Sequence, residues 1–270
     1  MFFGLSSYGQ AFWFVQKVLN LFDDVTVIAA RERIIDKVKG TSTWIGSIED
    51  ELDSEVFLTI RGRIMSGTVR INENLYEIQY KGNNQHEISQ VDPRKNPKLT
   101  QPLTIDSIES DIINTSPQAP ELITTEDITN ATVIDLLVLY TTKSKNNALG
   151  QSGIEAKISN AVAKANQAYI DSNIAMQLNI VYIGETSYIE SGDISTSLTQ
   201  LQGSADGQMD DVHVLRNQYA ADQVLLITSD ANACGIAYVM RNPSSDFDIG
   251  AFSVVHDDSV YACLSNNSLA

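Results

Sequence analysis

An alternation of apolar strands and amphipathic helices in the second half of the chain restricts its fold more than any other feature. Residues 133–140 are almost continuously apolar and β-branched, as expected of a strand covered on both faces. A helix follows, in which apolar residues recur at steps of three and four: Ile154, Ile158, Val162, Ala165 and Tyr169. Further strands are predicted at 176–183, 223–228, 234–240 and 250–256, with a second helix at 209–219. Alternating strands and helices require right-handed crossovers, so we predict a mostly parallel five-stranded α/β sheet.

A different pattern fills residues 21–92. Short runs of alternating apolar residues lie at 43–48, 55–60, 68–71 and 76–80. Residues 61–63 and 72–74, which contain Gly and Asn, are predicted to be turns between them. This pattern is typical of a small antiparallel β domain with one buried face. The whole chain is therefore expected to be α+β, with a β-rich domain ahead of the α/β domain at 132–270.

The segment between these regions is predicted to be a linker. Residues 93–131 contain five of the six prolines, and there is no Lys or Arg between Leu99 and Thr142. Such a segment cannot bury enough apolar surface to fold alone. It is either a site where an activating protease cuts or a plain spacer, and its composition fits both.

Residues 1–20 form an aromatic-rich N-terminal segment. No basic residue precedes its apolar stretch, and Ser6 to Gln10 interrupt it, so it is not a convincing export signal. No apolar run in the chain reaches the roughly 18 residues that a membrane span needs, so none is predicted.

Charge and metal-ligand counts restrict the possible chemistry. Residues 99–270 hold 6 basic and 21 acidic side chains, which disfavours binding to nucleic acid. Acidic clusters at 206–211, 230–234 and 246–250 allow calcium as a weak alternative to a solvated surface.

The chain has three histidines, His86, His213 and His256. His86 begins a sequence like a zincin motif, but Gln90 stands where the second histidine belongs. His256 is followed by two aspartates, which suits a proton carrier, although strand ends commonly carry polar groups. The three histidines lie on separate predicted elements, so we assign no metal ligand and no catalytic residue. The two cysteines are compatible with free buried thiols or with one disulfide.

Two groups of motifs resemble one known family. Cys234-Gly235-Ile236-Ala237 followed by Phe252-Ser253-Val254-Val255 resembles two strands of the metzincin zinc endopeptidases. The likeness is to the reprolysin-like branch and its bacterial peptidyl-Asp metallopeptidase relatives. Residues 43–71 resemble the propeptide of the same family. The resemblance implies a secreted zymogen, extracellular or periplasmic, in which residues 132–270 are the N-terminal part of a catalytic domain with the fourth strand antiparallel at its edge.

The resemblance also implies a chemistry and its location. In the family, zinc activates water for peptide-bond hydrolysis, and the ligands lie on a helix with the motif H-E-x-x-H-x-x-G-x-x-H. The first of these histidines would fall just after Ala270, so we expect the 270 residues to be inactive alone. We also expect poor solubility or dependence on a partner, because that helix would cover part of the sheet.

The strand at 234–240 is the one functional element that the resemblance places within the chain. By likeness to metzincins it pairs with an extended peptide or protein substrate, and an ordinary core strand is the alternative. The substrate-binding residues are then Gly235, Ile236, Ala237, Tyr238 and Val239, and family members favour a Cys234–Cys263 disulfide. Two other functions remain open: a non-catalytic binding or inhibitory protein, and an unrelated exported α/β module.

Overall fold

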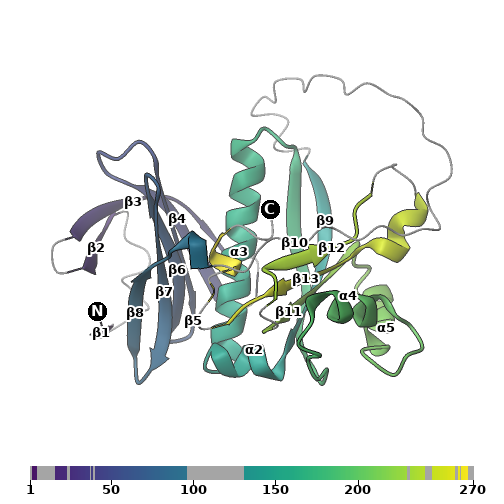
Figure 1. Cartoon of the computed structure of the whole chain (residues 1–270). Coiled ribbons are helices and arrows are strands. Elements are labelled where there is room, and N and C mark those ends of the chain that lie inside the picture. The colour runs from purple at the N-terminus through teal and green to yellow at the C-terminus, as the bar shows by residue number, and fades with distance from the viewer. Residues whose placement is uncertain are drawn as a thin grey trace. The chain divides into compact units, whose positions relative to one another are not determined.

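The structure is a computed structural model that describes residues 2–4, 16–22, 25–36, 38, 40–95, 131–229, 232–240, 245–258, 261 and 263–266. The chain divides into two compact units (Figure 1). Unit 1 comprises Met1–Asn96, Lys143–Lys164 and Asp258–Leu269. Unit 2 comprises Pro97–Thr142, Ala165–Asp257 and Ala270. The predicted linker lies almost wholly outside the described residues, apart from a short 3-10 turn at Pro93–Lys95.

Unit 1 contains an eight-stranded antiparallel sheet in the order β1-β8-β7-β6-β5-β4-β3-β2. Its strands are β1 (Phe2–Gly4), β2 (Gln16–Phe22), β3 (Val25–Ile35), β4 (Thr41–Ile48), β5 (Ser54–Arg61), β6 (Ile64–Ile71), β7 (Asn74–Gly82) and β8 (Gln85–Gln90). From β2 to β8 each strand pairs with the next along the chain, and β1 returns to pair with β8. The predicted antiparallel β domain is confirmed, and its four expected strands correspond to β4 through β7.

One face of this sheet buries a continuous apolar core. Trp44, Val56 and Val69 are fully buried at its centre, with Leu58 and Ile78 beside them. The hairpin between β5 and β6 turns at Gly62, whose φ of 62° is readily adopted only by glycine. Alternation of apolar and polar residues therefore gave the correct strand direction and turn positions.

Two helices follow the first strand of unit 2: α2 (Thr142–Asn147) and α3 (Gln151–Asp171). Residues 143–164 belong to unit 1, and the C-terminal end of α3 belongs to unit 2. At the junction of the helices, a Cβ on Gly153 would lie 1.8 Å from the carbonyl oxygen of Ala148, so only glycine fits there. The predicted apolar face of α3 is confirmed, since Ile154, Ile158 and Ala165 are fully buried.

Unit 2 contains a five-stranded sheet in the order β10-β9-β11-β13-β12. Its strands are β9 (Thr132–Thr141), β10 (Met176–Thr186), β11 (Gln223–Thr228), β12 (Gly235–Ala237) and β13 (Phe252–His256). All neighbouring pairs are parallel except β12 with β13. The predicted sheet, mostly parallel with an antiparallel edge strand, is thus confirmed.

Helices α4 (Ile194–Gln202) and α5 (Asp211–Gln218) belong to the same unit. Its core contains Leu137, Leu226 and Val254 from the sheet and Leu198 and Val212 from the helices. Helix α5 matches the predicted second helix, whereas α4 was not predicted. None of the described helices has the length and apolar character of a membrane-spanning helix.

Candidate substrate-binding edge

Strand β12 lies at one edge of the unit 2 sheet. It pairs with β13 in antiparallel register, with Gly235 opposite Val255 and Ala237 opposite Ser253. Ile236, between them, is 6% exposed and packs into the apolar core. An edge strand presents backbone N–H and C=O groups along its outer side, where another extended chain can add to the sheet.

The small residue at position 235 is not required by the packing of the strand. A Cβ built on Gly235 would lie 3.4 Å from the carbonyl oxygen of Val254 and 3.7 Å from Cγ2 of Val255, which are ordinary contacts. Ala237 is also small and is half-buried. Glycine therefore leaves space beside β12 that the fold itself does not use.

The other two predicted substrate-binding residues lie beyond the strand. Tyr238 is half-buried and packs against the core. Burial raises the pKa of the Tyr238 hydroxyl above its ordinary value. Val239 is 36% exposed. Regular strand geometry therefore covers Gly235, Ile236 and Ala237, and the chain leaves it at Tyr238.

Hydrogen bonds of Asp193 and Asn232 connect the segment that precedes β12 with the start of α4. Asp193 Oδ2 accepts hydrogen bonds from the Thr196 backbone N–H at 2.9 Å and from its hydroxyl at 2.8 Å. Asn232 Nδ2 donates to Asp193 Oδ1, and Asn232 Oδ1 accepts from the Ile194 N–H at 3.1 Å. The hydrogen bond from the Thr196 N–H holds the pKa of Asp193 below its ordinary value. This pair was missed in the sequence, although an Asp before Ile194, Leu198 and Leu201 is a helix-start signal.

His86 is a buried structural residue of unit 1. It lies in β8, fully buried, and its Nε2 accepts a hydrogen bond of 3.0 Å from the Met65 backbone N–H. Burial lowers the pKa of His86 to about 4. The ring is therefore neutral at ordinary pH, with one nitrogen engaged by the backbone.

The other two histidines belong to unit 2. His213, in α5, is half-buried, and its Nε2 lies 2.8 Å from the carbonyl oxygen of Gly203. His256 ends β13 and is fully buried, and its backbone N–H donates to the carbonyl oxygen of Cys234. Asp257, beside it, is also buried, and its N–H donates to the Thr228 carbonyl oxygen. A proton carrier at His256 stays the untested alternative to a structural role, and we assign no catalytic residue.

These histidines do not fit a catalytic zinc ion. They lie on β8, α5 and β13, and the Nε2 atoms of His86 and His213 face backbone groups. Within the described ranges, no three His, Cys, Asp or Glu side chains come close enough together to hold a metal ion. We therefore assign no catalytic step to them.

The acidic clusters considered for calcium are described only in part. In the cluster at 206–211, Asp210 accepts hydrogen bonds from the N–H groups of Asp206 and Gly207, so its carboxylate serves the loop. Asp230 lies outside the described residues. Calcium binding stays a prediction.

Both cysteines of the chain, Cys234 and Cys263, are disulfide-bonded. Disulfides persist in oxidising compartments, so this bond is consistent with an extracellular location.

The α/β unit with its antiparallel edge strand has the architecture expected of a metallopeptidase domain. A reprolysin-type family model described as metallo-peptidase family M12 matches residues 130–268. The matched segment is just over half of the 270-residue chain. The chain therefore belongs to the M12 metallopeptidase family.

Curated relatives agree with this assignment. The chain is 26% identical to a peptidyl-Asp metalloendopeptidase of Stenotrophomonas maltophilia, over 86% of its own length and 57% of that protein. It is 28% identical to a peptidyl-Asp metalloendopeptidase of Xanthomonas campestris, over 82% of its length and 55% of that protein. The chain thus spans about half the length of the curated relatives it matches.

Among solved structures, metalloproteinase-II from Bacteroides fragilis is similar, with 11% identity and a TM-score of 0.46. The match covers 88% of this chain and 74% of that one.

Proposed function

We propose that the chain is the propeptide and the N-terminal part of the catalytic domain of an exported zinc metalloendopeptidase of the peptidyl-Asp type. The family match begins at residue 130, next to the start of β9, and leaves the eight-stranded sheet outside it. The matches to the curated relatives cover more than four fifths of the chain, so they extend well beyond the family match. This supports a propeptide-like domain at 21–92, a linker at 93–131 and a catalytic part at 132–270.

Within this protein, we assign to the described part of the catalytic domain the binding of an extended peptide. The position of β12 as an antiparallel strand at the sheet edge carries this assignment. The unused space at Gly235 and the small side chain of Ala237 support it, because two backbones must approach closely to pair. Zinc ligands are not brought together by the described histidines, so we expect binding without hydrolysis.

A peptide-binding experiment tests this assignment. Affinity would be measured by fluorescence anisotropy for an extended peptide with a central Asp, on the chain and on Gly235→Val. We expect the variant to bind at least roughly tenfold more weakly, because its side chain fills the space beside β12. Its thermal midpoint should stay close to that of the parent, which separates lost binding from lost folding.

The matched control changes the peptide rather than the protein. Methylating alternate backbone nitrogens removes the donors needed for strand addition and keeps every side chain. Equal affinity for the methylated and unmethylated peptides would contradict pairing along β12. A zinc measurement tests the other half of the proposal: stoichiometric zinc with chelator-sensitive cleavage by these 270 residues would show that a metal site exists.

A further inference from the structure

The face of α3 that lies on the unit 1 sheet is polar. Glu155, Asn160 and Lys164 are 4%, 3% and 6% exposed, and all three lie in the part of the helix assigned to unit 1. Side chains of this kind are rarely so deeply buried in a permanent core. The contacts of these side chains with the sheet are therefore the interactions that hold α3 against it.

The first set of contacts joins α3 to β5. Arg61, at the end of β5, forms an ion pair of 2.5 Å with Glu155. Asn160 Nδ2 donates to the carbonyl oxygen of Phe57 at 3.2 Å and lies 3.1 Å from the hydroxyl of Thr59. Each of these contacts is directional, so together they set the position of the helix along the strand.

The second set centres on Glu77 of β7, whose carboxylate is almost fully buried. Its Oε1 accepts a hydrogen bond of 2.7 Å from the Ser265 hydroxyl and lies 3.9 Å from Nζ of Lys157. Lys164 Nζ donates to the carbonyl oxygen of Ser265. Burial lowers the pKa of Lys164 to about 8. One carboxylate on the sheet thus contacts both α3 and the segment at 263–266.

The apolar cluster that joins the sheet to α3 is small among the residues that the structure describes. It consists of Ile45, Phe57 and Ala163, with Ile35 beside it. The core of the sheet is a separate and much larger cluster around Trp44 and Val56. The interface therefore differs from a permanent core in composition.

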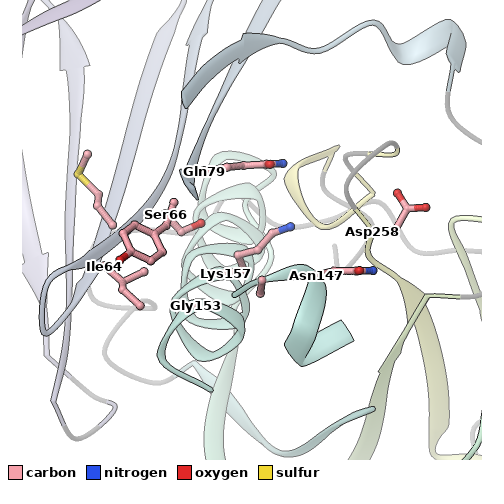
Figure 2. A pocket seen from close by; sticks show the side chains of 10 residues that line it. Ile64, Ser66, Gln79, Asn147, Gly153, Lys157 and Asp258 are labelled. Atoms are coloured by element: carbon pink, nitrogen blue, oxygen red, sulfur yellow. The ribbon is translucent and has the colours of Figure 1, made fainter. Parts of the chain in front are cut away.

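A cleft and a small cavity border this interface. A cleft of about 390 Å³ lies beside Glu55, Arg70, Lys164 and Ser265. A smaller cavity of about 20 Å³, enough for one water, is lined by polar groups of Gln79, Asn147, Lys157 and Asp258 (Figure 2). Water-accessible, polar contacts are typical of interfaces that form and separate.

We propose that the eight-stranded sheet is a separable binding domain that recognises the polar face of α3 together with residues 263–266, with Glu77 as the central determinant. After cleavage between the two domains, the sheet remains bound to this surface without a covalent link. The partner is thus the catalytic part of the same chain. This inference rests on the domain division proposed above, and it needs no catalytic activity.

The test uses the whole chain with a specific protease site inserted between residues 97 and 130. The folded protein is cut, the two pieces are diluted in steps, and their association is followed by analytical ultracentrifugation. We expect the parent pieces to remain together at micromolar concentration. Glu77→Gln should weaken association roughly hundredfold or more, because Lys157 loses its buried anionic partner.

Two variants make the result specific. Asn160→Ala removes hydrogen bonds to the sheet from the helix side, keeps a strong helix former, and should weaken association roughly tenfold. Glu87→Gln is the matched control: Glu87 pairs with Lys81 at 2.8 Å within the sheet and should leave association unchanged.

The outcomes separate this inference from the proposed function. Immediate separation of the parent pieces at micromolar concentration would overturn it, as would equal affinities for the parent and for both interface variants. Either result would leave peptide binding at β12 untouched. Circular dichroism of the uncut variants checks that the sheet and α3 are still folded.

Discussion

At the scale of single residues, the contacts of a buried polar side chain show whether its role is structural or chemical. His86 begins a sequence that looks like a zincin motif, yet its ring is fully buried in β8 and accepts a hydrogen bond from Met65. The missing histidine at Gln90 was enough to reject the motif from sequence. Sequence could not show what His86 does instead, because its partner lies on the adjacent hairpin, 21 residues away.

The buried His86 makes stability depend on pH. Its native pKa of about 4 lies below the ordinary 6.5, so the unfolded chain binds a proton between these values and the native chain does not. The free energy of unfolding should therefore fall as pH drops from about 6.5 to about 4, by up to about 3 kcal/mol. Urea titrations across this range measure it.

A matched pair of variants isolates the contribution of His86. In His86→Gln, the decrease in the free energy of unfolding at low pH that is due to this site should disappear. His213→Gln, which changes the half-buried histidine of α5, should retain that decrease. An unchanged pH dependence in His86→Gln would assign the effect to other groups.

At the scale of elements, strands with a clear apolar pattern were predicted from the sequence. Elements with a weak pattern were not. Strands β9, β10, β11 and β13 are rich in apolar residues and were located to within a few residues. In contrast, β8 is mostly polar in sequence, and its burial comes from its neighbours in the sheet. Strand pairing across the chain, as between β1 and β8, cannot be read from local pattern.

The candidate site was only partly accessible from sequence. The edge position of β12 was predicted from the family resemblance and not from the local sequence. The seven apolar residues at 234–240 predicted a longer strand than the three-residue strand that forms. Helix α4 was missed although Ile194, Leu198 and Leu201 are spaced as one helix face. The Asp193–Asn232 pair depends on a contact across 39 positions, which no short motif encodes.

The junction of α2 and α3 gives a prediction at this scale. Alanine normally stabilises a helix by about 1 kcal/mol relative to glycine. At position 153 the sign should reverse, because a Cβ would overlap the Ala148 carbonyl oxygen at 1.8 Å. Gly153→Ala should lower the free energy of unfolding by roughly 1–3 kcal/mol in denaturant titrations.

Gly235→Ala is the control, since the nearest atom to its Cβ would be 3.4 Å away. It should change stability far less than Gly153→Ala does. Similar losses in the two variants would mean that steric overlap at Ala148 is not the cause.

At the scale of the whole molecule, composition placed few limits on the function of the protein. The disulfide state of its two cysteines adds one structural feature. A net charge of −16 argued against nucleic-acid binding but did not select a function. Two cysteines left a free-thiol alternative open, and the structure has both in disulfide form. Along the chain, η4 (Ser245–Gly250) and β13 lie between the two cysteines, and β13 is the partner of β12.

Breaking this disulfide should weaken the protein and the substrate edge together. Cross-linking limits the unfolded chain, so replacing both cysteines by serine should lower the free energy of unfolding by about 2–4 kcal/mol. Dithiothreitol should lower the thermal midpoint of the parent and leave that of the double variant unchanged. Peptide affinity should also fall in the double variant, because Cys234 directly precedes β12 and its carbonyl oxygen accepts the His256 N–H. A parent midpoint insensitive to reduction would show that disulfide bonding contributes little to the stability of the folded protein.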